Sequence, residues 1–214
     1  MFKIGDELKV RVVSGIVLFT AAVFLIALGG AFYIFAVFLL AILCSAELFM
    51  ILGSSATEEG ENKTLMIKGV LAIFIPAVSI YIIREGFSKG VVTSFWFFIV
   101  VASVDVFAFF SGRLFGKHKI APEISPNKTW EGLIGGVFLA TIFSICFYYF
   151  FNSELNIFMF VLMSIIISIV AQVSDFCESF FKRRFNVKDS SNLIPGHGGF
   201  LDRLDGYFLT APLV

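Results

Sequence analysis

Long apolar runs alternate with short polar segments along the whole sequence. A helix needs about 20 predominantly apolar residues to cross a bilayer, and six runs are close to that length or longer. These runs cover residues 12–28, 31–53, 67–83, 91–111, 132–151 and 155–181. A further apolar stretch starts at residue 206 and is too short to cross alone. The pattern predicts an all-α polytopic integral membrane protein with about six to seven transmembrane helices.

The composition supports this prediction and excludes an ordinary soluble domain. Hydrophobic residues make up 58% of the chain and charged residues only 15%, whereas soluble domains carry about 25% charged residues. The formal net charge is zero, so nothing in the composition attracts nucleic acid, and no nucleic-acid partner is expected. The three cysteines lie in or beside apolar runs without metal-ligand spacing, which is typical of small hydrophobic residues in a membrane.

Lysines and arginines concentrate on one side of the predicted helices. If the N-terminus is cytoplasmic, Arg84 and Lys89 lie on the opposite side and the other 14 of the 16 basic residues are cytoplasmic. Basic residues favour cytoplasmic loops, so we expect a multi-pass protein of the cell inner (plasma) membrane. The two large polar segments, 112–131 and 182–206, then both face the cytoplasm, and we expect the active site on that side.

Four acidic residues lie in or at the edge of apolar runs, namely Glu47, Asp105, Asp175 and Glu178. A charge in hydrocarbon costs several kcal/mol, so such residues usually face a cavity, a partner or an ion. Glu47 is near the end of its run, where we expect its side chain to extend to the membrane interface. Asp105 lies deeper and is either part of the wall of a site or a structural hydrogen-bonding residue.

Two pairs of acids share a spacing of three residues, which places both carboxylates of a pair on one helix face. Asp175 and Glu178 form the first pair, and Asp202 and Asp205 form the second, just after a glycine-rich turn. Converging carboxylates suit Mg²⁺, which prefers oxygen ligands and substrate phosphates. We therefore predict that Asp175, Asp202 and Asp205 bind metal, and that Asp175 and Asp202 are catalytic.

Basic residues and glycines surround these acids in the sequence. Backbone amides of glycines can approach an anion closely, and lysine and arginine side chains bind phosphate. We predict a catalytic role for Lys188 and phosphate contacts for the other polar residues of the segment, namely Lys182, Arg183, His197, Gly198, Gly199 and Arg203. The alternative for Asp175 and Asp202 is a buried ion pair with Lys182 or Arg203. The segment thus combines acids that can bind a metal with basic groups that can bind phosphate, and it lies next to a predicted membrane helix. This combination favours phosphoryl or nucleotidyl transfer on a lipid.

A second polar segment, SPNKTWEG from Ser125 to Gly132, fits the same scheme. Lys128 can reach a phosphate, and we assign Ser125 and Lys128 to substrate binding. The alternative is that this segment only starts a helix, with Trp130 as an anchor at the membrane interface.

The stretch SFFKRRFNVKDSSNLIPGHGGFLDRLD, from Ser179 to Asp205, resembles the characteristic C-terminal motif of phosphatidate cytidylyltransferases, also called CDP-diacylglycerol synthases. The resemblance extends over roughly residues 100–210. It implies that CTP and phosphatidate react to CDP-diacylglycerol and pyrophosphate with Mg²⁺, and it allows a second cation. It also implies that Asp175 and Asp202 hold the metal centre.

On this basis residues 1–95 are predicted to form N-terminal transmembrane helices, and residues 96–214 a C-terminal catalytic transmembrane region with the motif at 179–205. The expected partners are CTP, phosphatidate and the lipid bilayer, and a homodimer is left open. Two other functions compete with this prediction. A transporter or channel would use the intramembrane acids as an ion path, but it predicts acids spread over several spans. A CDP-alcohol phosphotransferase would need further acids after the DRLDG sequence of residues 202–206, and none follows.

Overall fold

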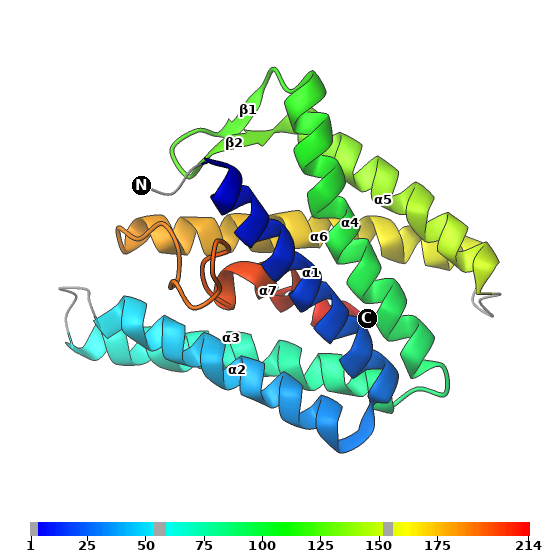
Figure 1. Ribbon diagram of the computed structural model, residues 1–214, viewed down its shortest axis with the longest axis horizontal. Helices are drawn as coiled ribbons and strands as arrows, with labels where there is room; N and C mark the ends of the chain where they lie inside the picture. Colours follow the sequence, from blue (N-terminus) through cyan, green and yellow to red (C-terminus); the bar gives the residue numbers. More distant parts are fainter. Residues whose placement is uncertain (1–3, 54–58, 152–155) are drawn as a thin grey trace.

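The computed structural model describes residues 4–53, 59–151 and 156–214, and most of these residues are helical (Figure 1). Two long helices, α1 and α2, are joined at Gly29, and a third, α3, follows. Their bounds are α1 Ile4–Leu28, α2 Gly30–Gly53 and α3 Glu59–Glu85. Gly29 and Gly30 both have positive φ, which allows the chain to reverse between α1 and α2 with a single residue outside the helices.

The second part of the chain contains three more long helices and several short elements. The bounds are α4 Gly90–Phe115, β1 Lys119–Ala121, β2 Ser125–Thr129, α5 Trp130–Phe150, α6 Ile157–Arg184, α7 Leu201–Phe208 and a 3₁₀ turn Ala211–Leu213. Strands β1 and β2 form an antiparallel hairpin. The Thr129 side chain then accepts a hydrogen bond from the amide of Gly132, which caps the start of α5.

The prediction of an all-α polytopic membrane protein is confirmed. Five helices are long and apolar enough to cross a membrane, and α1 adds a shorter apolar stretch, Val12–Leu28. The apolar stretch from residue 206 to residue 214 consists of the end of α7 and the 3₁₀ turn. The β-hairpin was not predicted. The sequence indicated a turn and the start of a helix in this segment but no strands, since the strands are short and carry little apolar alternation.

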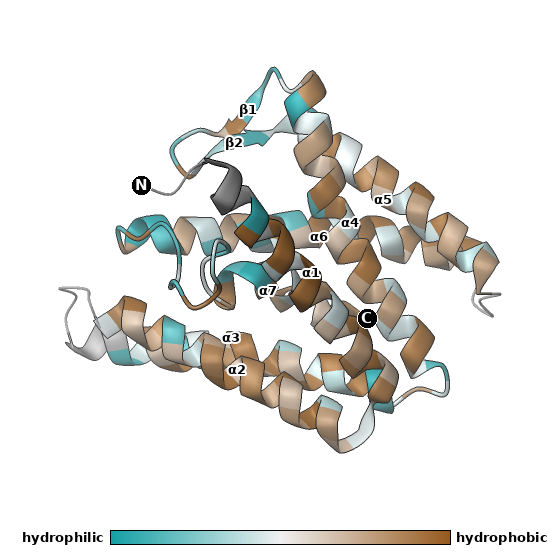
Figure 2. Ribbon diagram, viewed as in Figure 1, coloured by the Kyte–Doolittle hydropathy of each residue, from teal (hydrophilic) through white to brown (hydrophobic). Residues whose placement is uncertain are grey.

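Helices α2 and α3 lie side by side along one edge, α4 pairs with α5, and α6 crosses between the two pairs (Figure 1). Helix α1 runs across the front and contacts both α2 and α4. The short helix α7 packs on α6 in the middle of the molecule. Hydrophobic residues cover most of the long helices, whereas polar residues gather around the hairpin and the loop before α7 (Figure 2).

Two hydrophobic clusters hold these helices together. The first joins α4, α5 and α6 and includes Val100, Val104, Ala140 and Ile167, all fully buried. The second joins α2 and α3 to the C-terminal part of the chain, because Leu48 and Ala77 share it with Phe185 and Leu201. The short helix α7 is thus held in place from both predicted regions. The division into regions 1–95 and 96–214 itself stays a prediction.

Candidate active site

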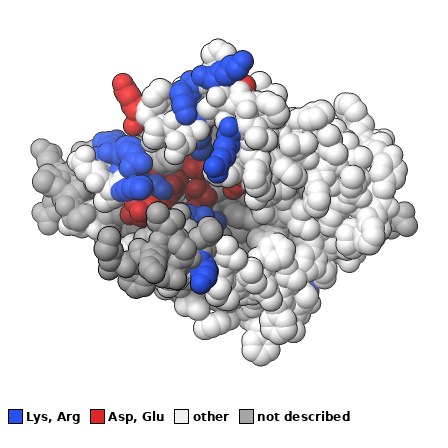
Figure 3. Space-filling model, turned by 45° about the horizontal axis from the view of Figure 1, so that its top comes forward, with Lys and Arg blue, Asp and Glu red and all other residues white. Residues whose placement is uncertain are grey.

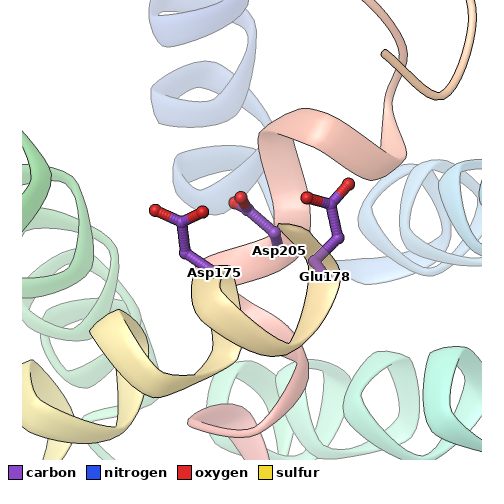
Figure 4. A group of neighbouring side chains, drawn as sticks. All are labelled: Asp175, Glu178 and Asp205. Carbon is purple, nitrogen blue, oxygen red and sulfur yellow. The ribbon is translucent and has the colours of Figure 1, made fainter. Parts of the chain in front are cut away.

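Three carboxylates converge where α7 packs against the C-terminal half of α6. Asp175 and Glu178 project from one face of α6, and Asp205 projects toward them from α7 (Figure 4). One oxygen from each of the three lies within 4.8 Å of the other two. A small hard cation prefers such converging oxygen atoms, so the donor set fits Mg²⁺.

Two lysines balance the charge of this acid cluster. The Nζ atom of Lys128, from the hairpin strand β2, lies 2.5 Å from an oxygen of Asp175. The Nζ atom of Lys182, one turn beyond Glu178, lies 2.7 Å from an oxygen of Glu178. The predicted involvement of Lys128 therefore has a structural basis, since the hairpin brings it next to α6. Its contact with substrate stays a prediction.

Asp202 does not point into the acid cluster. One of its oxygens accepts a hydrogen bond from Lys182 Nζ at 2.6 Å, and the other accepts from the amides of Ser190 and Gly199, each at 2.9 Å. Burial raises the pKa of Asp202, but these hydrogen bonds outweigh burial and hold the pKa below its usual value. The ion pair with Lys182, the alternative from the sequence, is present. The metal role of Asp202 stays a prediction, and the geometry groups Asp175 with Glu178 and Asp205 instead.

The pKa of Asp205 shifts in the direction opposite to that of Asp202. Burial raises the pKa of its carboxyl group well above the usual value, and the nearby charges of Asp175, Glu178 and Asp105 raise it further. The Ser174 hydroxyl donates a hydrogen bond to the backbone oxygen of Asp205, which fixes this part of α7 to α6. Crowded acids that raise one another's pKa are typical of a site built for a cation.

The glycine-rich turn between α6 and α7 is shaped by carboxylates. Gly196 and Gly198 have positive φ, a conformation that other residues rarely adopt. A Cβ atom on Gly199 would lie only 2.5 Å from both oxygens of Glu47, so a side chain there has no room. The Gly199 amide already donates to Asp202. Local packing thus explains these glycines, and their contact with phosphate stays a prediction.

Glu47 was predicted to extend to the membrane interface, and this prediction is wrong. Its side chain is fully buried. Its two oxygens accept hydrogen bonds from the hydroxyls of Ser190 and Ser191 and from the amides of Phe200 and Leu201. The position near the end of a span gave no signal of this, because the donors lie more than 140 residues away in the sequence.

Asp105, in α4, accepts a hydrogen bond from Gln172 Nε2 at 3.0 Å. The structural role considered for Asp105 is therefore present. A role as part of the site wall stays a prediction. Asp105 is close enough to Asp205 for its charge to raise the pKa of the Asp205 carboxyl group.

The remaining predicted residues come from the end of α6, the loop that follows it, α7 and the hairpin. Figure 3 shows acidic side chains bordered by lysines and arginines on one face of the molecule. Arg183 donates to the backbone oxygens of Ile124 and Val187, and Arg203 donates to that of His197. Lys188 is exposed in the loop before the glycine-rich turn, and Ser125 begins β2. Their substrate contacts stay predictions.

His197 is held by the first helix. Its Nδ1 atom lies 2.8 Å from the hydroxyl of Ser14 in α1, and the same hydroxyl contacts the backbone oxygen of Pro195. The N-terminal helix thus lies over the glycine-rich turn. Contact between His197 and a phosphate stays a prediction.

Fold and site together define an integral membrane protein with an acidic, lysine-flanked site suited to a metal and phosphate groups. A comparison with protein families agrees with this class. The sequence model of the cytidylyltransferase family matches residues 54–214. The chain therefore belongs to the cytidylyltransferase family.

Several curated relatives carry the same name. The phosphatidate cytidylyltransferase of Rickettsia bellii (strain RML369-C) is 38% identical over 220 residues, which cover 98% of this chain and 90% of that protein. The phosphatidate cytidylyltransferase of Rickettsia prowazekii (strain Madrid E) is 38% identical over 82% of this chain and 83% of its own length. That of Staphylococcus haemolyticus (strain JCSC1435) is 47% identical over 127 residues, which are 59% of this chain and 49% of the relative.

Proposed function

We propose that this chain is a phosphatidate cytidylyltransferase, which converts CTP and phosphatidate to CDP-diacylglycerol and pyrophosphate. The similarity to the Rickettsia bellii protein, over nearly the whole of both chains, carries the proposal. The site agrees in its chemistry, since acids and lysines converge beside membrane-spanning helices. A lipid phosphate and a nucleotide can both reach such a location.

In the proposed reaction an oxygen of the phosphatidate phosphate attacks the α-phosphorus of CTP. The bond from the α-phosphorus to the bridging oxygen breaks, and pyrophosphate leaves with that electron pair. The phosphate is already ionised at neutral pH, so no side chain has to remove a proton. His197 is accordingly proposed to contact phosphate rather than act as a base.

The chain's own residues have two tasks in this reaction. Asp175, Glu178 and Asp205 would hold Mg²⁺, which when bound neutralises charge on the phosphates. Lys128 and Lys182 lie at the edge of the acid cluster, where they offset its negative charge and that of an approaching phosphate. Lys188 is exposed, and its proposed role is to contact a nucleotide phosphate from the aqueous side.

The transporter or channel alternative finds no support in the relatives. The family match and the names of the relatives both favour the enzyme. The acids also lie together rather than along a path through the bundle, since three of them converge within 4.8 Å.

Transfer of radioactivity from CTP into lipid tests the proposed function. Purified protein in detergent, given phosphatidate and Mg²⁺, is expected to move label from α-³²P-CTP into lipid. With γ-³²P-CTP the label should appear in pyrophosphate instead. Replacing phosphatidate by diacylglycerol removes the attacking phosphate and serves as the matched control. Well-folded protein that transfers no label, or transfers it equally with diacylglycerol, would contradict the proposal.

The proposed location is the cell inner membrane, with the site on the cytoplasmic side. The 14 basic residues assigned to that side support this orientation. Both polar segments lie at the same end of the helices (Figures 1 and 2). The oligomeric state, for which a homodimer was left open, stays a prediction.

Cysteine labelling from outside sealed cells is expected to show this orientation. In a variant with Cys146→Ser and Cys177→Ser, a membrane-impermeant maleimide should not label Asn127→Cys or Asn192→Cys. It should label Ser88→Cys readily, because this exposed loop position lies on the opposite side. The three added cysteines are all at exposed positions, so access to the reagent is the only intended difference. Ready labelling at residue 127 or 192 would overturn the orientation.

A further inference from the structure

We propose that Glu47 is a positioning residue for the transfer reaction, which holds the glycine-rich turn and the start of α7 from a helix outside the family match. Glu47 belongs to α2, and the family match begins at residue 54. The proposal rests on the proposed function for its kinetic consequence. Its structural part, that Glu47 fixes residues 190–201, can be tested without any activity.

The contacts of Glu47 converge from both ends of this segment. Its Oε1 atom accepts from the Ser191 hydroxyl at 2.7 Å and from the Phe200 amide at 2.9 Å. Its Oε2 atom accepts from the Ser190 hydroxyl at 2.9 Å and from the Leu201 amide at 2.8 Å. A single carboxylate therefore joins the beginning and the end of the turn.

Glu47 acts as the cap of α7. The first amides of a helix have no partner within the helix and need an acceptor. Phe200 occupies the cap position of α7 and offers no side-chain hydrogen bond. Glu47 supplies the missing acceptor to Phe200 and Leu201, and its negative charge also suits the positive end of the helix dipole.

This cap matters for the site because α7 carries Asp205. Asp205 meets Asp175 and Glu178 only if the start of α7 has the right position and direction. Ser190 extends the link, since its hydroxyl lies 2.9 Å from oxygens of both Glu47 and Asp202. Because Gly199 has no side chain, the carboxylate of Glu47 can lie close to the backbone of the turn.

Glu47 is a positioning residue rather than a catalytic one. Both of its oxygens are already engaged by two donors each, and the side chain is fully buried. Neither oxygen is directed at the acid cluster where the reaction is proposed. Its effect on turnover must therefore pass through the loop and α7.

The test compares Glu47→Gln with Glu85→Gln. Glutamine keeps the size of glutamate, but its NH₂ group must face the amide of Phe200 or Leu201, so one backbone hydrogen bond is replaced by a donor facing a donor. Glu85 is the matched control, because its carboxylate also accepts from a backbone amide, that of Gly30, at the opposite end of the bundle. Both variants replace a charged acceptor of backbone amides by a neutral side-chain amide, but only at Glu47 do both oxygens accept from backbone amides.

Hydrogen exchange measured by mass spectrometry gives the readout that does not depend on activity. In Glu47→Gln, peptides covering residues 190–205 should exchange about tenfold faster or more, as expected for a lost hydrogen bond to a charged group. Peptides from α4 and α5 should not change. In Glu85→Gln the segment 190–205 should exchange as in the unaltered protein.

Turnover on the same samples tests the link to the reaction. For Glu47→Gln we expect kcat to fall about tenfold or more, whereas Glu85→Gln should keep its kcat, with both variants measured at a temperature well below their melting temperatures. Exchange in 190–205 that equals the control would overturn the anchoring by Glu47. Faster exchange with unchanged kcat would overturn its positioning role. If the unaltered protein transfers no label, the proposed function fails while the exchange result still decides the anchoring.

A second variant covers the case in which Glu47→Gln does not fold. Ser191→Ala removes one donor to Glu47. Because the Ser191 hydroxyl also accepts from the amide of Leu193, exchange is compared on peptides that cover residues 194–205. Ser191→Ala should raise exchange there several-fold and lower kcat, as Glu47→Gln does. Exchange as slow as in the unaltered protein would count against the proposal.

Discussion

Asp205→Asn is expected to lower turnover about 100-fold or more while the protein stays folded. Asparagine keeps the size of the side chain but removes the charge that a hard cation needs. The loss of transition-state stabilisation by a metal amounts to several kcal/mol, and each 1.36 kcal/mol is a factor of about ten in rate. Removing one charge from three crowded acids also relieves their repulsion, so stability should not fall. Label transfer from CTP and thermal melting in detergent, on the same samples, check both parts.

Asp175→Asn is expected to behave like Asp205→Asn, since Asp175 belongs to the same acid cluster. Asp202→Asn distinguishes two roles. A metal role predicts lost turnover at retained stability, whereas the ion pair with Lys182 predicts a lower melting temperature. The contacts of Asp202 with Lys182, Ser190 and Gly199 favour the second result. Near-normal turnover in Asp205→Asn would contradict the assignment of Asp205 to the metal.

Lys182→Met is expected to destabilise the protein by about 3–5 kcal/mol, the usual cost of leaving a buried charge without its partner. Lys182 lies between Glu178 and Asp202, at 2.7 Å and 2.6 Å from their oxygens, and all three residues are buried. Methionine fills a similar volume but cannot pair with either acid. Denaturation of the purified protein in detergent measures the change.

Two further variants sharpen this prediction. Lys119→Met, at an exposed position of the hairpin, is the matched control and should change stability little. Adding Glu178→Gln to Lys182→Met removes one of the unpaired acids and should recover part of the loss. If Lys182→Met melts like the control, the triad of Lys182, Glu178 and Asp202 does not stabilise the fold.

The fold was predictable from the sequence because hydrocarbon imposes a strict rule. Every span must be long and apolar, so five of the six predicted runs match helices that can cross the membrane, and the remaining one is the shorter apolar stretch of α1. The hairpin of β1 and β2 was missed because it lies outside hydrocarbon, where this rule does not apply.

The acids of the site were partly predictable, but their partners were not. Spacing indicated that Asp175 and Glu178 share a helix face, and the acid cluster contains both. Spacing also suggested that Asp202 and Asp205 act together, yet the start of α7 turns them toward different partners. Glu47 was missed because its partners become neighbours only after α2 packs against the loop and α7. Contacts between distant parts of a chain leave no periodic signal.

The second hydrophobic cluster, which joins α2 and α3 to α7, limits where the chain can be truncated. A fragment that starts at residue 54, where the family match begins, would lose Leu48 and Leu52 from the packing around Phe185 and Leu201. It would retain every acid of the cluster and still expose the apolar side of α7. The boundary of the recognisable family sequence is therefore not a boundary of cooperative folding, and truncations designed at residue 54 should yield aggregation rather than a minimal enzyme.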